Sequence, residues 1–206
     1  MRDMARLGLI LMGMSLICAA ALGFVNSQTE EKIAAQKVLI RQEAMNSVAA
    51  SLGTDLTFDS LAVPGISNPF EETGRTLAPV EVLSGGTRVG YIFTAYRKGY
   101  SSVIETLVAV DMTGTVMGSS ILYQMETPGL GTKYANPEWM TQLAGRNETT
   151  LSVSKDGGEV QAVTGATVSC RAIVYPVRDG IEAMRAAGLF DAAPAPADTT
   201  AGGGAV

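Results

Sequence analysis

The chain has 206 residues, a formal net charge of −5 at pH 7 and no histidine. This acidic balance argues against a nucleic-acid partner, which needs a basic surface to neutralise phosphates. Without histidine, and with only Cys18 and Cys170 as cysteines, the sequence excludes His/Cys zinc sites, cysteine-ligated iron–sulfur clusters and Ser-His or Cys-His nucleophiles. Any redox or group-transfer chemistry must therefore come from a bound cofactor.

Nineteen consecutive uncharged residues run from Leu7 to Val25. As a helix they would extend about 28 Å, which suits a single membrane-spanning anchor in contact with lipid. A cleaved signal peptide is the alternative, because residues 19–21 are all alanine, but the apolar part of such a signal is usually only ~7–15 residues long. We expect an uncleaved anchor in the cell inner membrane, with residues 1–26 comprising a cytoplasmic N-terminus and the span. The domain that follows is expected on the periplasmic side.

A second helical pattern covers Ser27 to about Leu52 and predicts an amphipathic helix. Its apolar face would hold Ile33, Ile40, Ala44, Val48 and Leu52. Residues Ser27 to Glu30 fit a capping box that would start a separate helix, and a helix continuous with the span fits equally well. Residues 53–79 are rich in Gly, Pro and Asn, which predicts an irregular segment. We therefore expect residues 27–79 to be a helix and connector.

Strand patterns follow at 80–83, 88–97, 103–110 and 115–124, with turns at 84–87 and 111–114. Short turns between alternating apolar segments predict two hairpins of one antiparallel sheet. The predicted fold class is α+β, with helices packed on a sheet of hairpins between residues 80 and 187. Residues 188–206 are rich in Ala, Pro, Thr and Gly, which predicts a disordered tail.

A loop is predicted from Met125 to Lys133, because Pro128 lacks a donor for a central strand and two glycines loosen the backbone. Asn136, followed by proline and glutamate, then predicts the start of a short helix. From the residues alone, this loop is a simple connection between the sheet and that helix.

Residues Glu159 to Val163 predict a strand, and the run Thr164–Thr167 predicts a tight turn into a helix with Ser169 in its first turn. The start of a helix carries unpaired N–H groups and the positive end of the helix dipole, so it favours an anion such as a phosphate. The same residue types are also the commonest helix caps and turn formers. The residues alone leave both interpretations of Thr167 open: a phosphate-binding residue or a helix cap.

The two segments ETPGLG (126–131) and TGAT (164–167) together resemble two signatures of the FMN-binding subunits of Rnf and Na⁺-pumping NADH:quinone reductase complexes. In that family the last threonine of the second signature carries FMN through a phosphoester bond, and the first signature lies beside the flavin. The resemblance covers roughly Leu7 to Ala186 and is closer to the Rnf G subunit. It implies the family's FMN-binding domain fold, with covalent FMN on Thr167.

By this resemblance no residue is catalytic and no metal is bound, and the remaining cofactor-binding residues can be assigned. They are Thr164, Gly165, Ala166, Ser169, Glu126, Thr127, Gly129, Leu130 and Lys133, the last as a counter-ion. Three departures stand out: Gln161 replaces an acid usually found six residues before the modified threonine, Ser101-Ser102 replaces a glycine-rich turn, and Pro176 should kink the last helix.

The implied function is that of an electron carrier in a redox-driven translocase. The chain would be a subunit of an Rnf-type ion-translocating ferredoxin:NAD⁺ oxidoreductase, with the other subunits and a flavin transferase as partners. One alternative is the C subunit of the Na⁺-pumping quinone reductase. The other is a membrane-anchored scaffold of the same fold without flavin, which Gln161 permits.

Overall fold

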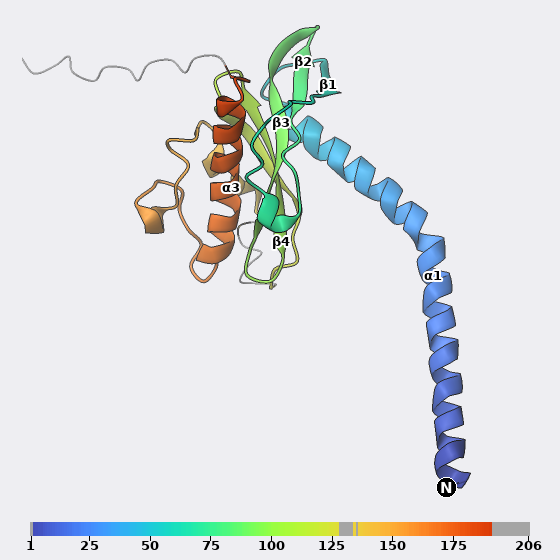
Figure 1. Cartoon of the computed structure of the whole chain (residues 1–206). Coiled ribbons are helices and arrows are strands. Elements are labelled where there is room, and N and C mark those ends of the chain that lie inside the picture. Colours follow the sequence, from blue (N-terminus) through green and yellow to red (C-terminus); the bar gives the residue numbers. More distant parts are fainter. Residues whose placement is uncertain (1, 128–133, 135, 191–206) are drawn as a thin grey trace, which may run out of the picture. The chain divides into compact units, whose positions relative to one another are not determined.

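The computed structural model describes residues 2–127, 134 and 136–190. The chain forms two compact units, Met1–Glu43 and Ala44–Val206. Helix α1 (Arg2–Ala49) makes up the first unit and enters the second as one uninterrupted element (Figure 1). Of the two predicted alternatives at Ser27, the continuous helix is the one observed. The Ser27 hydroxyl donates a hydrogen bond to the Phe24 carbonyl within this helix at 2.9 Å. Within the described part of the chain, α1 is the helix long and apolar enough to cross a membrane.

The second unit is built on a five-stranded antiparallel sheet in which spatial order follows sequence order. Its strands are β1 (Leu56–Ser60), β2 (Val80–Ser84), β3 (Thr87–Lys98), β4 (Val103–Asp111) and β5 (Val116–Tyr123). Strands β2 to β5 confirm the two predicted hairpins. The prediction of irregular structure for residues 53–79 is wrong at β1 and at the short 3-10 helix η1 (Glu71–Thr73). Strand β1 exists because it pairs with β2, where Phe58 lies opposite Val82.

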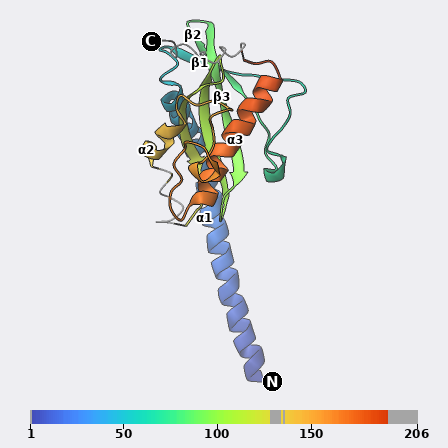
Figure 2. The same ribbon diagram turned by 90° about the vertical axis from the view of Figure 1, so that its left-hand side faces the viewer.

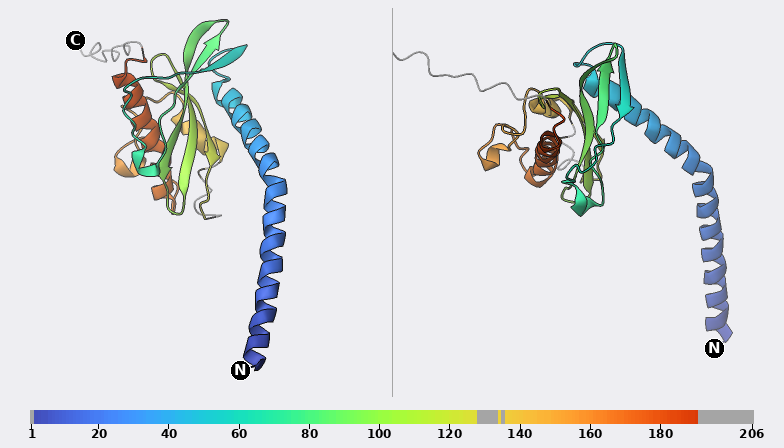
Figure 3. Two further views of the ribbon diagram at one scale, coloured as in Figure 1. Left: turned by 45° about the vertical axis from the view of Figure 1, so that its right-hand side comes forward. Right: turned by 45° about the horizontal axis from the view of Figure 1, so that its top comes forward.

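One face of the sheet is covered by helix α3 (Thr167–Ala186), which runs diagonally across the strands (Figures 2 and 3). The main apolar core lies between them and includes Phe93, Val108, Ile173 and Val177. Helix α3 continues through Pro176. Between β5 and α3 lie α2 (Pro137–Met140), η3 (Thr141–Leu143) and η4 (Ser154–Asp156). The predicted start of α2 is confirmed, because the Asn136 side chain caps it.

Three residues of the predicted tail, Gly188 to Phe190, make defined contacts with the rest of the domain. The Tyr91 hydroxyl donates to the Leu189 carbonyl at 2.9 Å, and the Phe190 ring packs edge-on against Tyr91 with centroids 5.8 Å apart. Apolar side chains at both positions find partners on the sheet that a compositional argument does not consider. The remaining predicted tail, residues 191–206, lies outside the described residues.

The opposite face of the sheet carries a second apolar cluster, to which the last turn of α1 contributes. Val48 and Ala49 are buried there against Val82, Ile92 and Leu107. The predicted amphipathic face is therefore used only at its C-terminal end. Toward the N-terminus of α1, Ile33 and Ile40 are exposed. The helix ends at Ala49, slightly before the predicted Leu52, and the division of the chain into four segments stays a prediction.

Candidate functional site

The candidate site begins where the chain enters α3. The predicted strand at 159–163 is wrong, because only Val160 pairs, in an isolated parallel bridge with Val153. The backbone folds back locally, with the Ser154 N–H donating to the Val160 carbonyl at 2.8 Å, so no longer ladder forms. The predicted turn is confirmed. Gly165 has φ of 86°, a left-handed conformation that glycine adopts without strain, and the next residues start the helix.

Helix α3 starts without a side-chain cap. Its N-cap position is Ala166, which has no capping group, and Thr167 is the first helical residue. The first backbone bond at this end joins the Cys170 N–H to the Ala166 carbonyl at 2.9 Å. Within the described structure, the N–H groups of Thr167, Val168 and Ser169 have no backbone acceptor. The interpretation of Thr167 as a cap is therefore wrong, and these free donors suit an anion.

A pocket of about 480 Å³ adjoins this helix end. It is lined by Tyr100, Glu126, Thr127, Gly165, Ala166, Thr167, Val168 and Ser169. The structure thus brings together the two signature segments, which are far apart in sequence, with the β3–β4 turn as a third wall. Thr164 is exposed in the turn and is not among these lining residues. The predicted positions Gly129, Leu130 and Lys133 lie outside the described residues.

Two lining residues, Tyr100 and Val168, were missed by the sequence reasoning. The side chain of Tyr100 is 77% exposed and that of Val168 is 51% exposed. An exposed aromatic residue in a Lys-Gly-Tyr-Ser-Ser turn was the available signal for Tyr100, because water-exposed rings often mark binding surfaces. Val168 carried no comparable signal, since apolar residues are ordinary in a helix.

The carboxylate of Glu126 is turned toward the protein itself and is only 6% exposed. Its Oε1 accepts hydrogen bonds from the N–H groups of Ser101 and Ser102 at 2.9 and 3.1 Å. Its Oε2 accepts from the Tyr100 N–H at 3.3 Å and from the Ser169 hydroxyl at 2.8 Å. Burial alone raises the pKa of Glu126, but these hydrogen bonds outweigh it and leave the pKa below its usual value. Glu126 is therefore ionised at neutral pH.

Ser169 was expected to act as a helix cap or as a donor to a bound phosphate. The structure contradicts the capping role, because Ser169 lies inside α3, is 2% exposed and donates its hydroxyl hydrogen bond to Glu126. The buried phenol of Tyr134 lies close by, and its pKa is raised first by burial and then by the charge of Glu126. Burial also raises the pKa of the Cys170 thiol, so the Tyr134 phenol and this thiol are both neutral at pH 7.

The departure at Gln161 affects a side chain whose backbone is firmly held. The Gln161 N–H donates to Gln142 Oε1 at 2.8 Å, and its carbonyl accepts from Trp139 Nε1 at 2.8 Å. Its side chain is exposed. Replacing an acid here therefore leaves the local backbone bonds intact and changes only what the surface presents beside the turn.

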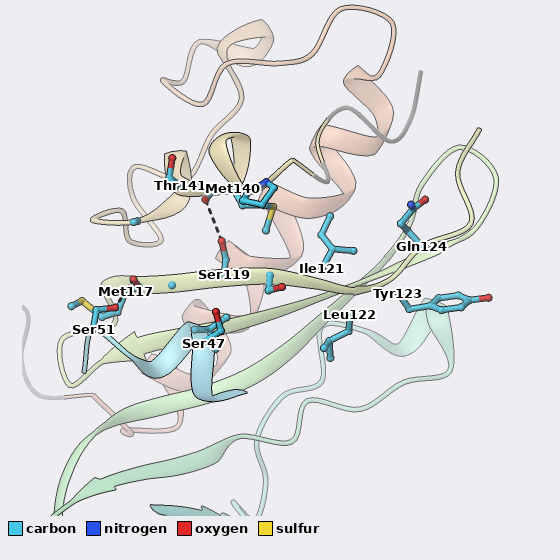
Figure 4. A pocket seen from close by; sticks show the side chains of 15 residues that line it. Ser47, Ser51, Met117, Ser119, Ile121, Leu122, Tyr123, Gln124, Met140 and Thr141 are labelled. Atoms are coloured by element: carbon cyan, nitrogen blue, oxygen red, sulfur yellow. Dashed lines mark hydrogen bonds between the residues drawn. The ribbon is translucent and has the colours of Figure 1, made fainter. Parts of the chain in front are cut away.

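A larger pocket, of about 620 Å³, lies along the edge strand β5, between Ser51, which follows α1, and Met140 of α2 (Figure 4). The Ser119 hydroxyl bridges its walls by donating to the Met140 carbonyl at 3.2 Å. The described residues that line it are all uncharged. Without a cation or a free helix N-terminus, this pocket is a poorer phosphate site than the one at Thr167.

Comparison with known families agrees with this geometry. Residues 99–182 match the FMN-binding domain family, and residues 1–48 match the RnfG N-terminal region. These two matches support an RnfG-type subunit. The first match contains Tyr100, Glu126 and Thr167, so the pocket lies in the FMN-binding domain.

Relatives of this chain include G subunits of ion-translocating oxidoreductase complexes. It is 40% identical over 102 residues to the G subunit of the ion-translocating oxidoreductase complex of Cronobacter sakazakii, covering 46% of this chain and 49% of that protein. It is 29% identical over 194 residues to the G subunit of the Na⁺-translocating ferredoxin:NAD⁺ oxidoreductase complex of Acetobacterium woodii, covering 86% and 89%. The chain thus spans about half the length of the first curated relatives it matches.

Solved structures resemble this chain in fold. The crystal structure of NqrC from Shewanella oneidensis has a TM-score of 0.56 at 20% identity, covering 74% of this chain and 96% of that one. The C subunit of the Na⁺-translocating NADH-quinone reductase from Parabacteroides distasonis has a TM-score of 0.51 at 16% identity, covering 66% and 78%. The predicted α+β fold is confirmed. With its apolar N-terminal helix, the chain is a membrane-anchored protein.

Proposed function

We propose that this RnfG-type chain carries electrons as a subunit of a membrane-bound, ion-translocating ferredoxin:NAD⁺ oxidoreductase, with FMN held on Thr167 through a phosphoester. The observation that carries the proposal is the uncapped N-terminus of α3, which opens at Thr167 into the pocket of the FMN-binding domain. When bound, FMN supplies the electron-transfer chemistry that the side chains of this histidine-free chain lack.

The residues around Thr167 fit a phosphate. A phosphodiester keeps one negative charge, which the free N–H groups and dipole of α3 stabilise by about 0.3–1 kcal/mol. Gly165 and Ala166 have no long side chains, so the Thr167 hydroxyl is open to an approaching reagent. Thr164, exposed in the same turn, is a further candidate donor to the phosphate oxygens. The assignment of Lys133 as a counter-ion stays a prediction.

Attachment requires a flavin transferase and an activated donor, which we take to be a flavin dinucleotide. The Thr167 oxygen forms a bond to the phosphorus of the FMN half while the anhydride P–O bond breaks. The nucleoside monophosphate half leaves with the electron pair, and a base of the transferase takes the hydroxyl proton. The exposed Gln161 side chain stands where the family usually has an acid, on the surface that this transferase would recognise.

The flavin ring would lie over the walls contributed by Tyr100, Thr127 and Val168. The exposed ring of Tyr100 can stack on an isoalloxazine face, since aromatic pairs gain energy beyond their buried area. Gly129 and Leu130 are expected to approach the same ring, as predicted from the resemblance. The protein would then fix the position of the ring and adjust its potential.

In the proposed topology, α1 anchors the chain in the inner membrane, the N-terminus is cytoplasmic and the FMN-binding domain is periplasmic. The other subunits of the complex would donate electrons to the flavin and accept them from it. The match of residues 1–48 to the RnfG N-terminal region favours an Rnf-type complex over the quinone reductase.

The test that separates an electron carrier from a flavin-free scaffold is the in-gel fluorescence of covalently bound flavin. The full chain is co-expressed with a flavin transferase, precipitated with acid to remove loose flavin, and separated on a denaturing gel. We expect a fluorescent band at the size of the chain. A dark band, while a known flavinylated protein is labelled in the same cells, would support the scaffold.

A further inference from the structure

The first turn of α3 presents two hydroxyls, on Thr167 and Ser169, that are chemically able to form the same phosphoester. The structure treats them differently. Thr167 is half-buried and lines the pocket, and it forms no capping bond. Ser169 also lines the pocket, but it is 2% exposed and its hydroxyl donates to Glu126 Oε2 at 2.8 Å. The difference between the two hydroxyls therefore lies in Glu126.

Glu126 is itself fixed from several sides, so its carboxylate cannot turn away from Ser169. Three consecutive N–H groups of the β3–β4 turn, from Tyr100 to Ser102, donate to its two oxygens. The Glu126 N–H donates to Gln124 Oε1 at 2.7 Å. The turn closes on the carboxylate tightly enough that a Cβ on Gly99 would lie 2.7 Å from Oε1.

We propose that Glu126 is a positioning residue that decides which of the two hydroxyls in the first turn of α3 accepts the flavin phosphate, by holding the Ser169 hydroxyl so that Thr167 is the one presented. This inference rests on the proposed covalent attachment. The exchange at phosphorus would be the same for either hydroxyl: an O–P bond forms, the anhydride P–O bond breaks, the nucleoside monophosphate leaves, and the transferase takes the proton. Only the accessibility of the oxygen differs.

A carboxylate beside a serine can also act as a general base that activates it. Here the geometry opposes that role, because each oxygen of Glu126 already accepts two hydrogen bonds and Ser169 is only 2% exposed. A carboxylate that is saturated with donors is a weak base. Glu126 therefore keeps the Ser169 hydroxyl from reacting and does not activate it as a nucleophile.

The test maps flavin adducts by peptide mass spectrometry on the full chain co-expressed with a flavin transferase. Thr167→Ala should carry no adduct, because Ser169 stays covered. In Thr167→Ala/Glu126→Ala, an adduct should appear on Ser169, because the hydrogen bond to a charged acceptor, which restrains a hydroxyl by about tenfold to a hundredfold, is removed. Thr167→Ala/Glu126→Gln is the size-matched control. Its amide fills the same space beside Ser169 without the charge, so its Ser169 adduct should stay well below that of Thr167→Ala/Glu126→Ala.

The single variant Glu126→Ala contains its own folding control. Adduct on Thr167 shows that the domain folds and is recognised, and we expect a second population on Ser169. If Thr167 alone is modified in that variant, or if Thr167→Ala is modified at Ser169 with Glu126 in place, Glu126 does not select the hydroxyl. An unmodified wild-type chain beside a labelled reference protein would instead overturn the covalent attachment itself, and the selection with it.

Discussion

Paired alanine substitutions in the first turn of α3 should separate flavin attachment from stability. Thr167→Ala removes a hydroxyl that caps nothing, so the free energy of unfolding should change by no more than about 0.5 kcal/mol. Ser169→Ala removes a buried hydrogen bond of 2.8 Å to the ionised Glu126. Hydrogen bonds to charged groups contribute about 1.5–3 kcal/mol, so this variant should be clearly destabilised.

The assay is thermal unfolding of the full chain in detergent, beside in-gel flavin fluorescence of the same samples. For a chain of this size, about 1 kcal/mol corresponds to about 2–4 °C in Tm. Ser169→Ala should therefore melt about 3–12 °C below wild type and still be fluorescent. Thr167→Ala should melt like the wild type without flavin and show no fluorescence. Equal losses of Tm in the two variants, or loss of flavin from Ser169→Ala, would refute this division of roles.

Three further predictions follow from the same contacts and from the anchor. Gly99→Ala places a Cβ 2.7 Å from Glu126 Oε1 and 2.9 Å from Ile104 Cδ1, so it should lower stability by about 1–3 kcal/mol in denaturant titrations. Because the folded-state pKa of Glu126 lies below its usual 4.5, its stabilisation is present above that pH and is lost as the pH falls through the folded pKa. Tyr134, whose pKa is raised by burial and by the charge of Glu126, stays neutral there, so Glu126→Gln should reduce the acid sensitivity. Finally, protease added to intact spheroplasts should digest the domain, and protection there with digestion only in inverted vesicles would reverse the proposed topology.

Local patterns were sufficient to predict most of the sheet. Strands β2 to β5 are rich in apolar and β-branched residues and are joined by short turns, so each hairpin carries its own signal. Strand β1 does not, because its five residues sit among glycines and prolines and become a strand only by pairing with β2. The reverse error occurred at 159–163, where a strand-like pattern found no partner beyond Val153.

The site was predictable where it depends on a contiguous motif. The turn at Gly165 and the helix starting at Thr167 follow from local residue types, and only the structure decides that the helix end is uncapped. The contact between Glu126 and Ser169 joins residues 43 positions apart. No spacing rule relates a loop to a helix at that distance, so the tertiary fold was needed to show that one predicted ligand restrains another.

The most direct test of the central claim is the mass of one peptide. Trypsin should cut after Lys155 and Arg171 and release residues 156–171, which contain Thr164, Thr167 and Ser169. In the chain matured with a flavin transferase, we predict that this peptide carries one FMN and that fragmentation places it on Thr167. An FMN on Thr164, on Ser169 or on another peptide would contradict the assignment, and an unmodified peptide would contradict covalent flavin in this protein.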